Sequence, residues 1–302
     1  MRLGRLLPLL LLLLLTPAAA RAQAATPTPT PAPTPTATPT PAPAAAVVSP
    51  EKQKLNDELY EAVRKGDAAA VKAALDRGAD VNAKFRYGAT ALFKAADLGK
   101  ADVVKLLIER GADVTVRDTF YGATAMTWAL SKEHVEAIHA ILEKSPDEAG
   151  DVLSTGTRSG NVALVRVALD KGGLKPESLT GALVAATEAG EKGAEIVELL
   201  KKAGAQPPAE VDAATLQTYA GRYKGTQGPE LVFSVKDGKL IAAPAGQQPL
   251  TMYALDKTTF KPAAFDGITV VFTPEAGKVN GFTLKQGPAT IPYTRVEEAK
   301  QP

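Results

Sequence analysis

Residues 78–83 have the sequence Gly-Ala-Asp-Val-Asn-Ala, and residues 111–116 have the sequence Gly-Ala-Asp-Val-Thr-Val, 33 positions later. A second motif, Tyr-Gly-Ala-Thr-Ala-Leu at 87–92, returns as Tyr-Gly-Ala-Thr-Ala-Met at 121–126, after 34 positions. A repeat of this length indicates similar structural units stacked side by side. Such units bury in the stack the apolar faces that one unit cannot bury alone.

Two short helices are predicted between these motifs. The first spans 91–97 and is followed by Gly99. The second spans 101–110, and Gly111 ends it, as a glycine in the left-handed conformation commonly does. Apolar residues at helical spacing give this second helix its buried stripe: Val103, Val104, Leu106, Leu107 and Ile108.

The repeat resembles the ankyrin repeat in the run Thr-Ala-Leu-Phe-Lys-Ala-Ala at 90–96, in Gly99 and in Asp-Val-Val-Lys-Leu-Leu-Ile at 102–108. The resemblance covers about residues 54–206 and implies a helical solenoid that binds protein partners through its hairpin tips and inner helix face. The five units that it implies lie at 59–77, 91–110, 125–144, 152–171 and 179–203.

Some positions depart from the ankyrin pattern. The family's proline is Ala91 or Ala125 here, its structural histidine is Phe93 or Thr127, and Glu133 replaces the glycine between the helices of the third unit. The hairpin before the fourth unit is shortened. These differences imply divergent packing, because the family's histidine is a hydrogen-bonding residue and not a catalyst.

The C-terminal region has a different periodicity. Pro207 and Pro208 interrupt the helical pattern, and after Leu216 apolar and polar residues alternate. Asp237-Gly238 is typical of a tight hairpin turn. Expected strands around and after this turn are 231–236, 239–243, 250–255, 259–262, 268–273, 278–285 and 291–296. Such a series of short strands predicts a small antiparallel barrel or sandwich, so the fold class is multidomain α + β.

Residues 213–297 resemble the β-rich accessory domain that follows the catalytic domain in hydrolases related to serine β-lactamases and penicillin-binding proteins. The resemblance rests on the motifs at 219–223, 237–240, 271–272, 277–284 and 295–296, and on Phe260. In that setting the domain assists a hydrolase and is not its chemical centre. Here the ankyrin-like region occupies the place of the hydrolase.

Residues 1–22 have the features of a secretory signal peptide: Arg2 and Arg5, an apolar stretch at 6–15, and a small-residue end. Cleavage is expected after Ala22, and the alternative is an uncleaved anchor. The mature protein is therefore expected to be secreted or periplasmic, with no stable membrane insertion. The chain contains no cysteine for a lipid anchor or a disulfide.

Residues 23–53 are rich in proline, threonine and alanine, and we expect a disordered linker with extended polyproline II character. It either serves as a spacer from a membrane or wall, or has no specific role. Nucleic acid is not an expected partner, because loss of the three arginines of 1–22 leaves 32 Lys and Arg against 33 Asp and Glu.

The sequence offers little material for catalysis. The two histidines, His134 and His139, are five positions apart and are not patterned as metal ligands; His134 suits a local contact at a helix start. A Ser-x-x-Lys motif at 49–52 lacks the other motifs of a serine hydrolase. We expect no enzymatic activity, no cofactor and no metal, while a cryptic hydrolase would require a reactive Ser49.

The candidate binding residues lie at two successive hairpin tips: Phe85, Arg86, Tyr87, Arg117, Phe120 and Tyr121. Aromatic side chains and arginine are enriched at binding hot spots, so these residues are expected to bind a protein partner. Because the chain is expected to be exported, that partner is expected to be another exported or envelope protein. The alternative is that Tyr87 and Tyr121 pack against neighbouring hairpins and that Phe85 and Phe120 cover an edge. For the whole chain, two other functions stay open: a small-molecule or lipid carrier that uses the β domain, and a structural spacer at the cell envelope.

Overall fold

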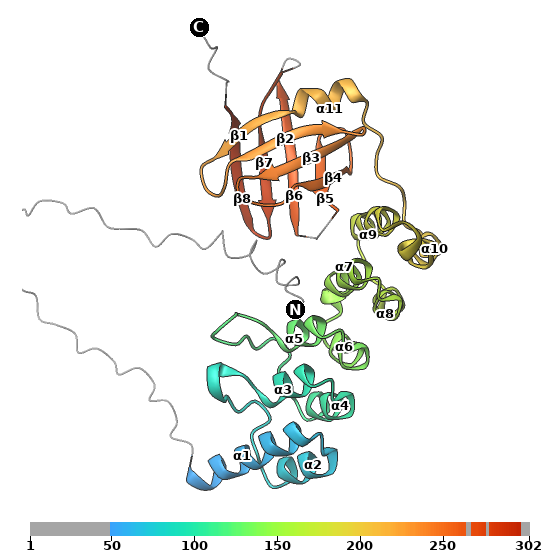
Figure 1. The fold of residues 1–302 in the computed structure, drawn as a ribbon. Helices are drawn as coiled ribbons and strands as arrows, with labels where there is room; N and C mark the ends of the chain where they lie inside the picture. The colour runs from blue at the N-terminus through green and yellow to red at the C-terminus, as the bar shows by residue number, and fades with distance from the viewer. Residues whose placement is uncertain (1–48, 264–266, 276–277, 297–302) are drawn as a thin grey trace, which may run out of the picture.

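The computed structural model describes residues 49–263, 267–275 and 278–296. The expected signal peptide at 1–22, its cleavage site, and all of the expected linker before Ser49 lie outside these residues. The described chain is a stack of helix pairs followed by a β-barrel (Figure 1). This agrees with the expected α + β class.

Five helix pairs form the stack, each overlapping one of the units expected from the sequence. They are α1 (Pro50–Lys65) with α2 (Ala68–Asp76), α3 (Ala91–Asp97) with α4 (Ala101–Glu109), α5 (Ala125–Ser131) with α6 (Val135–Leu142), α7 (Ala149–Ser159) with α8 (Val162–Lys171), and α9 (Pro176–Glu188) with α10 (Ala194–Lys202). The first helix of each pair lies on the inner side of the stack, toward the hairpins, and the second lies on the outer side (Figure 1).

Helix α1 begins earlier than the sequence indicated. Its first residue is Pro50, so the helix starts within the expected linker and before the expected domain start at residue 54. Proline is well suited to the first helical turn, where its missing N–H group has no partner to lose. The Ser49 hydroxyl accepts a hydrogen bond from the Lys52 backbone at 3.3 Å and caps the helix. Ser49 is thus an exposed helix cap.

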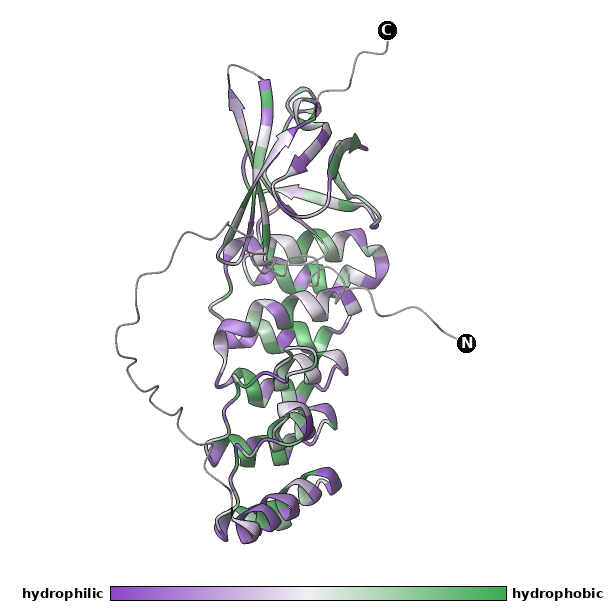
Figure 2. Cartoon of the chain, turned by 90° about the vertical axis from the view of Figure 1, so that its left-hand side faces the viewer, coloured by the Kyte–Doolittle hydropathy of each residue, from purple (hydrophilic) through white to green (hydrophobic). Residues whose placement is uncertain are grey.

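Aliphatic side chains from the helix pairs share one continuous core. The largest fully buried side chains in it come from successive pairs: Leu59, Leu92, Leu107, Met126, Ile138, Ile141 and Leu142. Hydrophobic positions recur in every layer of the stack (Figure 2). The core is therefore built between neighbouring units, as a repeat architecture requires.

The turn between the helices of a unit needs a positive φ angle. Gly99 has φ 65°, and a Cβ atom there would lie 2.6 Å from Nδ1 of His134, so both the backbone and the close ring favour glycine. Glu133 adopts φ 55° at the corresponding turn of the next unit. Its carboxylate accepts a hydrogen bond from the Asn161 side-chain amide at 3.0 Å, which links it to the following unit.

Two side-chain amides hold the hairpins in place, one from α1 and one from the first hairpin. The Asn56 carboxamide oxygen accepts a hydrogen bond from the Asp80 backbone at 2.8 Å. The Asn82 side chain accepts from the Asp113 backbone at 2.8 Å and donates to the Gly111 carbonyl at 3.1 Å. Within its own turn, the Asp113 carboxylate accepts hydrogen bonds from the hydroxyl and the backbone N–H of Thr115. These two bonds lower the pKa of the Asp113 carboxyl group. The repeated Gly-Ala-Asp motif thus fixes the spacing of the hairpins.

The C-terminal strands form a closed antiparallel barrel. They are β1 (Gly221–Gly225), β2 (Leu231–Lys236), β3 (Lys239–Pro244), β4 (Leu250–Ala254), β5 (Thr259–Pro262), β6 (Ile268–Glu275), β7 (Lys278–Gln286) and β8 (Ala289–Arg295). Strand order follows chain order, and β1 pairs with β8 to close the ring. Of the two expected architectures, the barrel is the one that forms.

Helix α11 (Ala213–Tyr219) covers one end of the barrel (Figure 1). The helix continues three residues beyond Leu216, where the sequence pattern changes. Its Tyr219 ring stacks on Phe272 with 4.2 Å between ring centroids. Arg295, at the end of β8, donates hydrogen bonds to the carbonyls of Thr218 and Ala220. The helix is thereby fixed both to the interior of the barrel and to its last strand.

The barrel contacts the helical stack at α9. Tyr253 of β4 points outward from the barrel, is only 4% exposed, and donates a hydrogen bond to the Glu177 carbonyl at 2.9 Å. Lys239 and Glu188 form an ion pair with an N–O distance of 2.8 Å. Gly181 faces the same tyrosine, and a Cβ atom there would lie 2.7 Å from the tyrosine oxygen.

The contact at Gly181 gives a first testable prediction. Gly181→Ala places a methyl group against the Tyr253 hydroxyl, and overpacking of this kind costs about 1–3 kcal/mol, less the gain in helix propensity. Tyr253→Phe removes the clashing oxygen together with its hydrogen bond. We expect the double variant to lose less free energy of unfolding than the sum of the single variants, measured by urea denaturation. Strict additivity would show that the two residues do not meet.

Candidate protein-binding groove

A groove of about 350 Å³ opens on the hairpin side of the first three helix pairs. It is bounded by α1, α3, α5 and the two hairpins that precede α3 and α5. Six aromatic side chains line it: Tyr60, Tyr87, Phe93, Phe120, Tyr121 and Trp128. Residues far apart in the sequence meet here because the stack places α1, α3 and α5 in adjacent layers.

The rings along the groove form a chain in which each ring contacts the next. Tyr87 lies 5.4 Å from Phe120, Phe120 lies 4.5 Å from Tyr121, and Tyr121 lies 5.9 Å from Trp128, measured between ring centroids. Aromatic pairs at these separations attract one another in tilted and edge-to-face arrangements. The groove therefore presents a connected aromatic surface.

Three of these rings remain open to solvent. Tyr87 is 49% exposed, Phe120 63% and Tyr121 56%, the highest values among the large apolar side chains that the structure describes. The other two exposed large apolar residues in the described ranges, Val232 and Val296, lie on the barrel. A contiguous exposed apolar surface of this kind is typical of an interaction site.

The structure places the expected tip residues in different environments. Tyr87, Phe120 and Tyr121 form the exposed surface described above. Arg86 lies over the Tyr87 ring, with its guanidinium carbon 4.7 Å from the ring centroid, and donates to the Tyr87 hydroxyl at 2.7 Å. This places a cation and an aromatic ring together at the groove edge.

Two expected residues are engaged within the protein. Phe85 is half-buried against Tyr60, with 4.3 Å between the ring centroids. Arg117 is exposed, but it donates a hydrogen bond to the Gly122 carbonyl at 2.8 Å and does not line the groove. Phe85 therefore packs on helix α1, and Arg117 is held within its own hairpin.

Asp118 is the residue that organises the second hairpin, and the sequence analysis did not single it out. One carboxylate oxygen accepts hydrogen bonds from the backbone N–H groups of Phe120 and Tyr121, at 2.9 and 2.5 Å. The other accepts from the Trp128 indole at 3.2 Å. One buried carboxylate thus holds three rings of the groove in place, and the run Asp-Thr-Phe-Tyr at 118–121 is the signal that could have revealed it.

The groove also contains a charged pair. Lys94 and Asp97 of α3 form an ion pair with an N–O distance of 3.0 Å, and each is partly buried. A partly buried pair is less screened by salt than an exposed one. A ligand in the groove therefore meets a lysine and a carboxylate beside the aromatic rings.

The two histidines that the sequence analysis considered lie at separate positions of α6. His134 lies at the start of α6 but makes no side-chain cap there. Its Nε2 atom is 3.1 Å from the Asp97 carbonyl of the preceding unit, so its contact is between units and not the local contact at the helix start that the sequence analysis expected. His139 is exposed and 4.0 Å from Glu143. Within the described ranges, no three His, Asp or Glu side chains group as metal ligands do.

Outside the groove, burial raises the pKa of the Glu148 carboxyl group, and the nearby Asp151 carboxylate raises it by a smaller amount.

In the part of the chain that the structure describes, none of the helices has both the length and the apolarity needed to cross a bilayer.

Comparison with protein families identifies the repeats that form the groove. Residues 59–154 match the family model for ankyrin repeats, in three copies. The match begins within α1 and extends into α7, and every residue that lines the groove lies within it. Ankyrin repeats are protein–protein interaction modules and are typically non-catalytic. The chain has no match among the curated proteins.

Removal of the Asp118 carboxylate tests whether it holds the groove. We expect Asp118→Ala to lower the free energy of unfolding by about 1–3 kcal/mol, because three donors lose their acceptor. The emission of Trp128, the single tryptophan of the chain, should shift to longer wavelength as the indole meets water. Fluorescence and urea denaturation measure both effects.

Asp147→Ala is the matched control, because Asp147 is an exposed carboxylate outside the groove. Unchanged emission and an unchanged midpoint in Asp118→Ala would contradict the role assigned to this residue.

Proposed function

We propose that this protein is an exported, non-catalytic interaction module that holds a protein partner in the aromatic groove. The observation that carries the proposal is the row of exposed rings from Tyr87 to Tyr121, with Arg86 beside it, on a rigid ankyrin scaffold. Aromatic residues and arginine account for much of the binding energy in protein interfaces. Hairpin tips fixed by a packed core place these side chains without a large ordering cost on binding.

The groove suits a segment of a folded partner that carries an apolar anchor side chain. Its volume of about 350 Å³ has room for one or two side chains. Lys94 and Asp97 flank the rings and provide one charge of each sign for polar groups of the partner. The partner is therefore recognised by an apolar residue with polar groups around it, as in interfaces that have an apolar core and a polar rim.

Export is supported by the N-terminal sequence. The basic start, apolar stretch and small-residue end of residues 1–22 are those of a secretory signal. The proline-rich segment that follows would separate the ankyrin region from a membrane or wall. The partner is then another exported or envelope protein, and the barrel serves as an accessory domain, as its sequence motifs suggest.

Affinity capture with a groove variant tests the proposal. The bait carries Tyr87→Ser, Phe120→Ser and Tyr121→Ser, which removes the exposed rings and leaves the buried core in place. Val232→Ser with Val296→Ser is the matched control, because it removes exposed apolar side chains from the barrel instead. Captured proteins from an envelope or secreted fraction are identified by mass spectrometry, and the partner is then purified and titrated against Trp128 fluorescence.

We expect the groove variant to bind the purified partner at least about tenfold more weakly than the unmodified chain, as loss of a hot spot does. The control should bind with unchanged affinity. A partner that binds both variants equally would place the interaction elsewhere on the protein, and the proposed function of the groove would be wrong.

A further inference from the structure

The interior of the barrel is divided into two unlike halves. Toward α11 it is filled by rings in mutual contact, among them Tyr223, Phe233, Phe272 and Phe282, with centroid separations of 5.1–6.1 Å. Toward the opposite end, where β2 begins and β7 ends, the inward residues are smaller and leave a cavity. A barrel of about eight strands is usually just filled by its own side chains.

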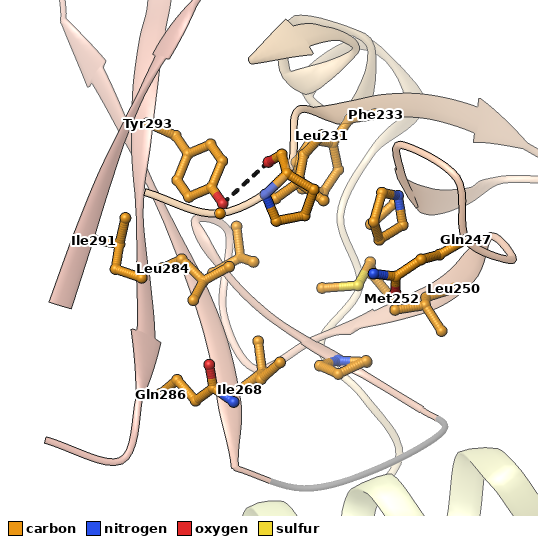
Figure 3. Close-up of a pocket in the computed structure, with 16 residues that line it drawn as sticks. Leu231, Phe233, Gln247, Leu250, Met252, Ile268, Leu284, Gln286, Ile291 and Tyr293 are labelled. Carbon is orange, nitrogen blue, oxygen red and sulfur yellow. Dashed lines mark hydrogen bonds between the residues drawn. The ribbon is translucent and has the colours of Figure 1, made fainter. Parts of the chain in front are cut away.

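The cavity has a volume of about 80 Å³ and an almost entirely apolar lining (Figure 3). Ala242, Leu250, Met252, Leu284 and Ile291 contribute much of its wall. Well-packed protein interiors contain few voids larger than one water molecule. An engineered apolar cavity of about 150 Å³ admits benzene, so the smaller space here suits a short alkyl group.

One polar atom at the cavity has no hydrogen-bond partner. Oε1 of Gln286 is buried and unpaired, and Gln286 lies at the end of the cavity beside Ile268 (Figure 3). The Tyr293 hydroxyl, by contrast, donates to the Pro229 carbonyl at 3.3 Å. A buried carboxamide oxygen without a donor is costly to the fold, and a ligand that donates a hydrogen bond would remove this cost.

The lining also indicates the charge of the ligand. Among the described residues that form the cavity wall, none is Asp, Glu, Lys or Arg. A carboxylate or ammonium group would be desolvated there without a counter-ion, which is strongly unfavourable. Water is a poor occupant of the apolar part of the cavity, because a buried water requires two to four polar partners.

We infer that the open half of the barrel binds the short alkyl end of an uncharged molecule that carries a hydroxyl group. The alkyl end occupies the space bordered by Ala242, Met252 and Ile291. The hydroxyl group donates a hydrogen bond to Oε1 of Gln286. This site shares no lining residue with the ankyrin groove, so the inference does not rest on the function proposed for the groove.

The methionines make the site directly observable. Met252 lines the cavity, while Met126 is fully buried in the ankyrin core, and these are the two methionines within the described ranges. The full chain labelled with ¹³C at the methionine methyl groups is titrated with two probes, xenon and 2-methyl-1-propanol. We expect the Met252 signal to shift and saturate with both probes while the Met126 signal stays unchanged.

Filling the cavity tests its location. Ala242→Leu places a larger side chain in the space and should abolish the Met252 shift with both probes. Ala243→Leu is the matched control, because the next residue of β3 points to the outer face; it should preserve the shift. Absence of a Met252 shift in the unmodified chain, or its persistence in Ala242→Leu, would overturn the inference.

Gln286→Leu tests the hydrogen bond separately. We expect this variant to bind 2-methyl-1-propanol about three- to tenfold more weakly, the loss expected for one hydrogen bond, with xenon binding retained. Equal weakening of both probes, or no weakening of alcohol binding, would show that Gln286 does not recognise the hydroxyl group.

Discussion

The helical half of this protein depends on the burial of apolar helix faces that no single helix pair can complete. Each pair leaves one side of its core uncovered, and only the next pair covers it. The Asn82 side chain bridges successive hairpins in the same register. Because the hairpins are held at this spacing, the side chains at their tips meet between neighbouring units, and the groove is a product of the stacking itself.

The barrel satisfies a different constraint. Closure through β1 and β8 pairs the backbone groups of strands that would otherwise be sheet edges. The aromatic half of the interior supplies a dense apolar core close to α11, and burial there raises the pKa of Tyr223. Because the aromatic end supplies the packing, the opposite end of the barrel can retain a cavity. One end of the barrel thus stabilises the domain, and the other end offers space for a ligand.

Repetition made the helical units predictable from the sequence. The returning Gly-Ala-Asp motif and Gly99 mark turns by local backbone chemistry, which a sequence displays directly. The groove was only partly predictable: the exposed tip rings follow from the hairpins, but Tyr60 and Trp128 join them through stacking, which no local pattern reports. Arg117 carried the right chemistry for an interface, yet its hydrogen bond to Gly122 depends on the hairpin conformation. The alternation of the strands likewise indicates which residues face inward, but not whether they fill the interior.

The two ends of the stack have unlike neighbours. Helix α1 packs on α2 and α3, whereas α9 also meets the barrel through Tyr253. In a one-dimensional array, cohesion comes from adjacent units, so the terminal unit with the weaker contacts frays first. Tyr60 lies on that unit and on the wall of the groove. A partner bound between Tyr60 and the hairpins would therefore hold the first unit against the next ones. It would slow the fraying of this unit and prolong the folded lifetime of the whole stack.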